Sequence, residues 1–176
     1  MELRGDGVVL RPWRIEDVPA VAAACQDPEI ARWLALVPQP YTEDDARFYV
    51  QDCIDAPEDR RPFAITDAST GEVIGSIDMR INRLQTGHIG YWMAAEARGR
   101  GLTTAALSAL SRWAIENLGL GRVELVTDPA NIASQRVAEK AGFQREGVLR
   151  SMLLCRDGSR RDGVMFSLLP EELRSA

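Results

Sequence analysis

A glycine-rich turn between an apolar segment and a long amphipathic one is the part of this sequence with the clearest chemical meaning. Its residues are Arg98, Gly99, Arg100, Gly101, Leu102 and Thr103. The two glycines let the backbone turn tightly. A helix that starts directly after the turn points its free N–H groups and its positive dipole end back into it. With two flanking arginines, this corner predicts a binding site for a phosphate group.

The turn does not match two better known phosphate motifs. A P-loop would carry Gly-Lys-Ser or Gly-Lys-Thr after the first glycine, and this sequence does not. The dinucleotide-binding fingerprint needs a third glycine or alanine in register, which is also missing here. Taken alone, the two glycines could serve turn geometry only, so the function needs further residues.

Composition and length narrow the class of protein. The chain has 176 residues, which fits a single domain over 1–176, and its 45% hydrophobic and 27% charged residues are those of an ordinary globular protein. The net charge of −5 argues against nucleic-acid binding. With no secretory signal at residues 1–6 and no long apolar run, we expect a cytoplasmic protein without membrane contact. Three separated cysteines and one histidine predict neither disulfides nor a metal site.

Hydrophobic periodicity predicts an α/β (α+β) fold, in which a mixed central sheet of about seven strands is flanked by helices. The predicted strands are 8–13, 61–66, 72–80, 88–93, 122–128, 148–155 and 163–169. The predicted helices are 17–24, 28–34, 42–54, 103–117 and 131–141. Asp17 is the expected cap of the first helix, and Thr42 with Asp45 the capping box of the third. In the last helix we expect Ile132 to point inward.

A second motif follows the glycine turn by about 30 residues. It begins with Asn131-x-x-Ser134 and ends with Lys140-x-Gly-Phe143. Together with the turn, this order of motifs resembles the GCN5-related N-acetyltransferase (GNAT) family, and within it the Rim-type branch that acetylates the N-termini of ribosomal proteins. Matches at the opening 10–12 and the closing 147–150 and 161–164 extend the resemblance over nearly the whole chain.

The resemblance implies a fold, a cofactor and several binding residues. In this family acetyl-coenzyme A lies in a V-shaped opening between the fourth and fifth strands of the sheet. Carried over by motif, the backbone amides of residues 98–103 would bind its diphosphate. The main chain of Trp92, Met93 and Ala94 would pair with the pantetheine arm, and Asn131 would hydrogen-bond the arm or the acyl end.

The expected reaction is attack of a neutral amine on a thioester. An α-amine is about one tenth neutral at pH 7, whereas a lysine amine is neutral at only about one part in 2,500. His88, at the start of the fourth strand, is a candidate base because its unperturbed pKa lies near 6.5. In that case His88→Ala should lower turnover by ~10²-fold. Asp78 and Glu96 are weaker candidates, and His88 could also be a strand-edge residue without a role.

Two further groups complete the expected chemistry. Family members often carry a tyrosine, the donor of a proton to the leaving thiolate, where this chain has Ala138. Ser134 could donate that proton directly or through water, or it could cap the helix or only bind the cofactor through its hydroxyl. The backbone N–H of Met93 is the expected oxyanion donor, unless a strand partner uses it. Thr103 also departs from the motif, which prefers glycine or alanine there.

The sequence therefore predicts an N-acetyltransferase that uses acetyl-coenzyme A. The Rim-type resemblance implies a protein N-terminal amine as acceptor, while a small amine or an antibiotic is the alternative. A longer acyl donor and a non-catalytic acyl-coenzyme A-binding module also stay open. A homodimer is an expectation from the family.

Overall fold

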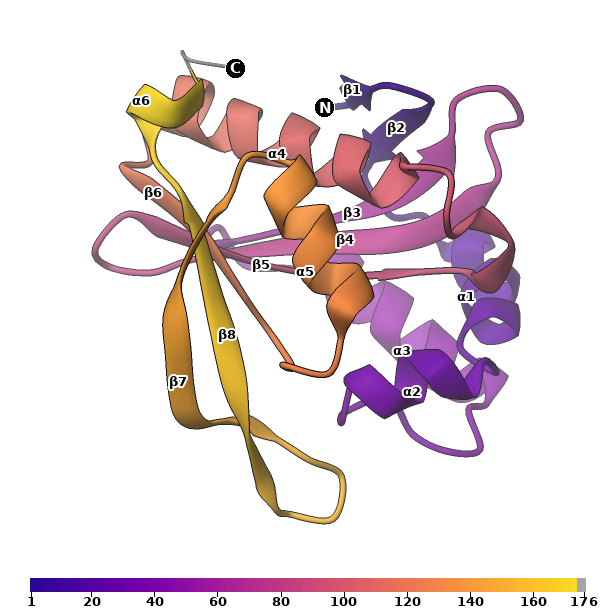
Figure 1. Cartoon of the computed structure of the whole chain (residues 1–176). Coiled ribbons are helices and arrows are strands. Elements are labelled where there is room, and N and C mark those ends of the chain that lie inside the picture. Colours follow the sequence, from indigo (N-terminus) through magenta and orange to yellow (C-terminus); the bar gives the residue numbers. More distant parts are fainter. Residues whose placement is uncertain (174–176) are drawn as a thin grey trace.

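The computed structural model describes residues 1–173, which contain one open sheet of eight strands in the order β1-β2-β3-β4-β5-β6-β8-β7 (Figure 1). The strands are β1 Leu3–Gly5, β2 Val8–Arg11, β3 Arg60–Asp67, β4 Val73–Ile81, β5 Thr86–Met93, β6 Arg122–Thr127, β7 Gln144–Leu154 and β8 Arg160–Leu168. All neighbours pair antiparallel except β5 and β6, which are parallel. The mixed α/β fold expected from the sequence is confirmed.

The sheet has one strand more than the sequence suggests. The additional strand β1 pairs with β2 through Leu3 opposite Leu10 and Gly5 opposite Val8. Gly7, with a φ of 72°, makes the turn between the two strands. Three residues are too few to show a two-residue alternation, so periodicity does not reveal this strand.

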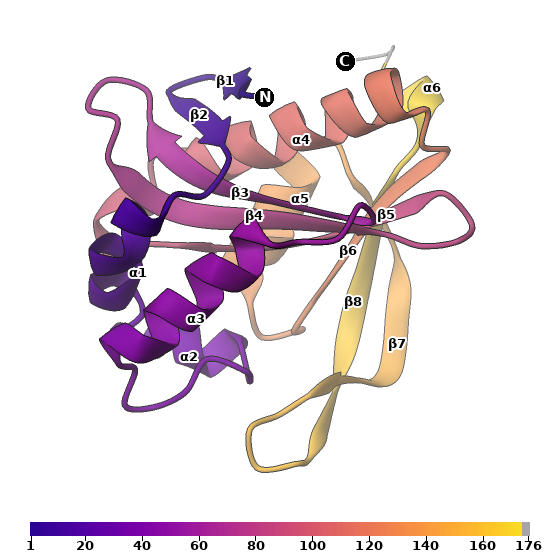
Figure 2. The same ribbon diagram turned by 180° about the vertical axis from the view of Figure 1, so that it is seen from behind.

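Two layers of helices cover the sheet. The helices are α1 Val18–Ala24, α2 Pro28–Trp33, α3 Glu43–Ile54, α4 Leu102–Leu118, α5 Ile132–Lys140 and α6 Pro170–Leu173. Figure 1 shows α4 and α5 on one face of the sheet, and Figure 2 shows α1 and α3 on the other. Each layer buries its own apolar cluster, with Leu107 and Leu110 in the first and Val21 and Val50 in the second.

Local capping signals set the starts of α2 and α3. Asp27 accepts the N–H of Glu29 at 3.0 Å, and a proline follows it at the first helical position. Thr42 accepts the N–H of Asp45 at 3.1 Å, while the Asp45 carboxylate accepts the N–H of Thr42 at 2.8 Å. The capping box expected from the sequence is therefore confirmed.

The carboxylate of Asp17 has a different role from the expected cap. It accepts two hydrogen bonds from the Arg11 guanidinium, at 2.8 and 2.7 Å, and one from the N–H of Arg14 at 2.9 Å. Arg11 is 9% exposed and Asp17 is 6% exposed. The expectation that Asp17 caps α1 with its side chain is wrong, because this buried ion pair between β2 and α1 uses the carboxylate instead.

The first turn of α5 directs different side chains toward the sheet from those that the sequence predicts. Ile132 is 52% exposed, whereas Ala138 is fully buried and packs in the core. The inward side of this turn carries Ala133 and Ser134, which line the cavity described below. Ile132 therefore points away from the sheet, and the prediction that it faces inward is wrong.

The strands β5 and β6 separate along their length. They pair only over Thr86–His88 and Arg122–Glu124, and α5 lies over the place where they diverge (Figure 1). These are the fourth and fifth strands of the sequence prediction, so the predicted V-shaped opening is present. Within residues 1–173 no helix is long and apolar enough to cross a membrane.

Candidate active site

The diverging ends of β5 and β6 border a cavity of about 350 Å³. Residues 89–93 of β5 and 125–128 at the end of β6 form one part of its lining. The helix α2 with Leu34, the start of α5 as far as Val137, and Leu153 of β7 form the rest, together with Arg98 and Thr103. The cavity thus joins the two sequence motifs, which lie about 30 residues apart in the chain.

The main chain of Met93 faces the opening. Met93 lies opposite Gly75 of β4, and the next residue, Ala94, donates its N–H to Ile74 O at 2.9 Å. Because hydrogen-bonded and non-bonded pairs alternate in an antiparallel ladder, the N–H and C=O of Met93 point away from β4. The same alternation turns Trp92 and Ala94 toward β4. Of the three predicted main-chain contacts, the register leaves the Met93 N–H open to a ligand, while the Met93 C=O accepts from the Arg98 side chain.

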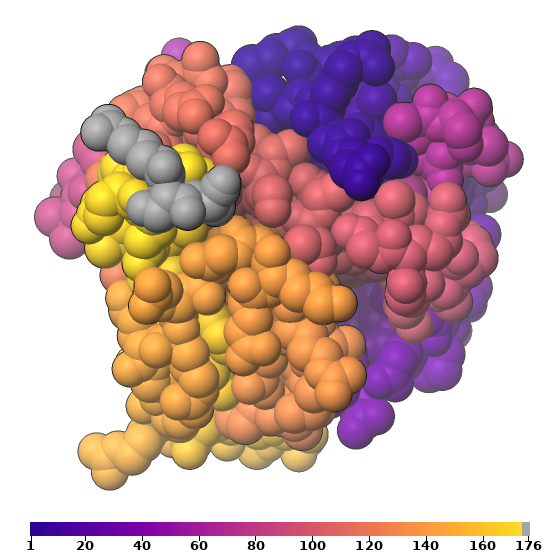
Figure 3. Space-filling view, turned by 45° about the horizontal axis from the view of Figure 1, so that its top comes forward, coloured from indigo at the N-terminus to yellow at the C-terminus, as the bar shows by residue number. Residues whose placement is uncertain are grey.

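The glycine turn presents unbonded N–H groups at the start of α4. Gly99 and Gly101 have φ values of 76° and 81°, the left-handed region that favours glycine. The first hydrogen bond of the helix runs from Ala105 N to Gly101 O, so the N–H groups of residues 102–104 precede it. Figure 3 shows α4 at the surface between the N-terminal residues and the α5–β7 region. This geometry fits an anion at the turn.

The two arginines of the turn are held by carboxylates. Arg98 contacts Asp27 at 2.6 Å and donates to Met93 O at 3.0 and 2.8 Å. Arg100 pairs with Asp67 at 2.9 Å. Hydrogen bonds from Ser69, together with Arg100, lower the pKa of Asp67 to about 2, so this partner stays charged at neutral pH. The ion pairs of both arginines fix the position of the turn. The side chain of Leu102, which follows the second glycine, is buried.

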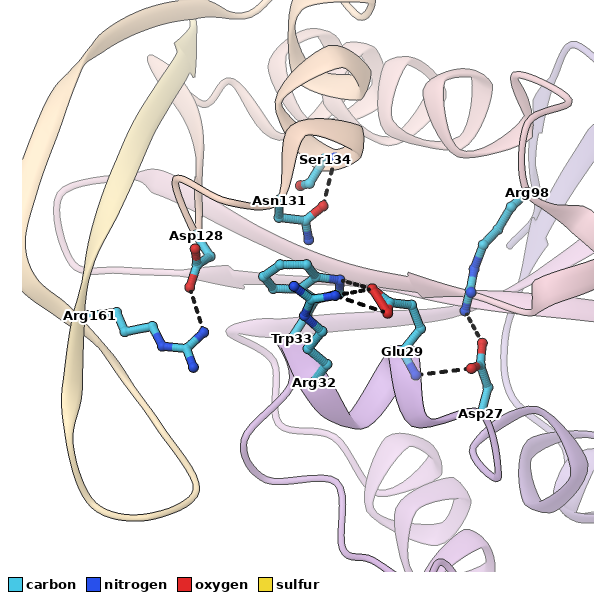
Figure 4. Close-up of polar contacts among 9 residues, drawn as sticks. All are labelled: Asp27, Glu29, Arg32, Trp33, Arg98, Asp128, Asn131, Ser134 and Arg161. Atoms are coloured by element: carbon cyan, nitrogen blue, oxygen red, sulfur yellow. Dashed lines mark hydrogen bonds and ion pairs between the residues drawn. The ribbon is translucent and has the colours of Figure 1, made fainter.

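Asn131, Ser134 and Tyr91 meet at the start of α5. The Asn131 Oδ1 accepts the N–H of Ser134 at 3.1 Å and so caps α5 (Figure 4). This bond leaves the amide NH₂ of Asn131 to other partners. The Ser134 hydroxyl lies 2.8 Å from the Tyr91 hydroxyl of β5. Burial raises the pKa of Tyr91, so its phenol stays protonated and able to donate to Ser134. Sequence reasoning did not find this role for Tyr91.

His88 lies outside the cavity. Its side chain is 45% exposed, and its Nδ1 lies 3.7 Å from Glu124 Oε1 in the paired part of β5 and β6. Over residues 1–173, the lining contains none of His88, Asp78 and Glu96. The lining therefore gives no support to a direct base role for His88, which stays a prediction.

The helix α2 supplies lining residues that the sequence did not indicate. Trp33 is half-buried and lines the cavity together with Glu29. The Trp33 Nε1 donates to Glu29 Oε1 at 3.1 Å, and the Arg32 guanidinium lies over the indole ring, 4.5 Å from its centre. A six-residue helix shows too little periodicity to separate a core tryptophan from one at a cavity.

Comparison with known protein families identifies the architecture. A model of the acetyltransferase (GNAT) domain matches residues 8–144, a range that includes the glycine turn, the opening and Asn131. The chain belongs to the GNAT acetyltransferase family. The family resemblance drawn from its motifs is therefore confirmed, and this acetyltransferase uses acetyl-coenzyme A, the thioester that supplies the acetyl group.

Three relatives illustrate the similarity. N-acetyltransferase p20 of Bacillus licheniformis is 29% identical over 170 residues, 94% of each chain. The "Putative ribosomal N-acetyltransferase YdaF" of Bacillus subtilis is 32% identical over 153 residues, 81% of this chain and 79% of YdaF. The structure of Mycobacterium smegmatis RimJ in complex with CoA-disulfide is 26% identical, with a TM-score of 0.84 over 98% of this chain and 88% of RimJ. Rim-type enzymes are thus among the relatives of this acetyltransferase.

Proposed function

We propose that this acetyltransferase acetylates the α-amine at the N-terminus of a protein or peptide. One observation carries the proposal: over residues 1–173, the cavity lining offers carboxylates but no imidazole and no lysine. An α-amine has a pKa near 8 and needs little help to become neutral, whereas an amine of pKa near 10.4 needs a strong base. The similarity to YdaF, which is named a putative ribosomal N-acetyltransferase, supports a protein as the acceptor.

In this proposal each residue of the opening would have one role in binding or catalysis. The N–H groups of residues 102–104 bind the diphosphate, and the Asn131 amide holds the arm near the thioester. The Met93 N–H donates to the carbonyl oxygen as negative charge develops on it. The amine nitrogen would form its bond to the carbonyl carbon while the carbon–sulfur bond breaks, and the proton that this nitrogen loses would pass to water. Ser134 would donate a proton to the sulfur and regain one from water, while the Tyr91 phenol keeps its own proton and orients Ser134 through their hydrogen bond.

Ser134→Ala is expected to lower kcat about tenfold and to leave the KM for acetyl-coenzyme A unchanged. The loss falls below the ~10²–10⁴-fold typical of a general acid, because a thiol with a pKa near 8.5 already leaves readily. Tyr91→Phe, which keeps the ring and removes the hydroxyl, should show a smaller drop in kcat in the same steady-state assay. An unchanged kcat in Ser134→Ala would exclude Ser134 as the proton donor.

His88→Ala is expected to change kcat/KM by less than about threefold, well short of the ~10²-fold loss that removal of a base causes. The reason is its position outside the cavity lining and the acidity of the α-ammonium group itself. The measurement is the pH–rate profile of both proteins with one peptide acceptor. A pH–rate profile that changes shape in the variant would restore His88 as a base acting through water.

The acceptor is tested by incubating the protein and acetyl-coenzyme A with peptides, polyamines, aminoglycosides and amino acids. Thiol release and the mass of each product are measured. We expect acetylation of peptide N-termini; preferential acetylation of a small amine would contradict the proposal. Binding of coenzyme A without any product would instead indicate the non-catalytic module that Ala138 suggests. The homodimer stays a prediction, to be measured by light scattering.

A further inference from the structure

A carboxylate and an indole from α2 face the Asn131 and Ser134 side of the cavity (Figure 4). The Glu29 Oε1 accepts the Trp33 Nε1–H at 3.1 Å and one contact from Arg32 at 3.3 Å. Its side chain is 45% exposed. Because Arg32 is itself 58% exposed, this ion pair is weak and can give way to another cation.

The position of Glu29 is fixed relative to the glycine turn. Asp27 caps α2 by accepting the Glu29 N–H, and the same carboxylate contacts Arg98 at 2.6 Å. Arg98 in turn donates to Met93 O. The Glu29 N–H bond, with the Arg98 contact, lowers the pKa of Asp27, which keeps the link charged. A continuous chain of contacts, through Asp27 and Arg98, therefore connects Glu29 to the main chain of Met93, beside which we place the thioester.

The second carboxylate of the lining is already occupied. Asp128 accepts the Ala130 N–H at 2.8 Å and contacts Arg161 at 3.2 Å. Among the described lining residues, Glu29 is thus the carboxylate whose ion pair a cationic ligand can replace with the smallest loss of free energy. The apolar neighbours Trp33 and Leu34 lie on the same helix end and offer a surface beside it.

We infer that Glu29 binds the ammonium group of the incoming acceptor before this group loses a proton to water and attacks as the neutral amine, and that Trp33 packs against the apolar side chain next to it. The inference rests on the proposed function and deepens it. The acceptor class is then a peptide whose first residue is uncharged and apolar. An acidic first residue is disfavoured, because its carboxylate would lie near the negative charge of Glu29 and of Asp128.

The experiment compares three peptides that differ only in a first residue of leucine, alanine or aspartate. In wild-type protein we expect the leucine peptide to have the highest kcat/KM and the aspartate peptide the lowest. Glu29→Gln removes the charge but keeps an oxygen for the Trp33 N–H. This variant should raise the KM for the leucine peptide about tenfold, as expected for loss of a charged hydrogen bond. It should also reduce the ratio of kcat/KM for the leucine peptide to kcat/KM for the aspartate peptide.

The matched control is Glu43→Gln, which removes a similarly exposed glutamate paired with Arg47 on α3. Its kinetics should equal those of the wild type. An unchanged peptide KM in Glu29→Gln, with normal turnover of acetyl-coenzyme A, would overturn this inference alone. No amine turnover by the wild-type protein would overturn the proposed function together with it. Thermal melts of both variants confirm that the proteins compared are folded.

Discussion

Gly101→Val is expected to weaken coenzyme A binding by ~10²-fold or more, the equivalent of two lost hydrogen bonds to a charged group. Gly101 has a φ of 81° and directly precedes the first residue of α4. A β-branched residue is a genuine outlier in that region, so the turn must change its conformation. The N–H groups of residues 102–104 would then no longer converge on one anion. Isothermal titration with coenzyme A measures the loss.

Gly119→Val is the control at the opposite end of the same helix. Gly119 has a φ of 68° and ends α4, so the substitution brings comparable backbone strain far from the turn. Both variants should lose ~1–2 kcal/mol of stability. Only Gly101→Val should lose affinity for coenzyme A in the folded protein. Wild-type affinity in Gly101→Val, or an equal loss in Gly119→Val, would contradict the assignment of the diphosphate to this turn.

Asp17→Ala is expected to destabilise the protein by ~3–5 kcal/mol, because it leaves the Arg11 guanidinium buried without its charged partner. Both side chains are at most 11% exposed, and two of their atom pairs lie within 2.8 Å. The Arg14 N–H loses its acceptor as well. For a chain of this size the melting temperature should fall by roughly 6–20 °C. Urea denaturation gives the free energy of unfolding directly.

Two variants separate charge burial from a general effect of substitution. In the double variant Arg11→Met with Asp17→Leu both charges are removed, so most of the lost stability should return. Glu43→Gln removes one partner of the exposed Glu43–Arg47 pair and should change stability by less than ~1 kcal/mol. If the double variant is as unstable as Asp17→Ala, the loss comes from packing and the unpaired guanidinium is not its cause.

Local signals in the sequence were enough to predict several elements. The Thr42–Asp45 capping box and the Asp27-Pro28 start of α2 depend on residues within three positions of each other, so their hydrogen bonds need no contact with distant residues. The glycine turn is equally local, because its left-handed backbone and the helix start that follows require no distant contact. Such features made the anion corner and the family resemblance visible in the chain alone.

Side-chain direction at the site was decided by tertiary structure. His88 stood close in sequence to the opening, yet strand register and the pairing with β6 place it outside the cavity. Tyr91 reaches Ser134 across 43 positions, and Trp33 lines the cavity because α2 is fixed to the turn by Asp27 and Arg98.

By itself, then, the sequence determined the family and the local geometry of the glycine turn, because these depend on short motifs with their own backbone conformation. The tertiary structure decided which hydroxyls and carboxylates share the cavity. Contacts such as Tyr91–Ser134 and Asp27–Arg98 exist only once strand register and helix packing bring distant residues within hydrogen-bond distance.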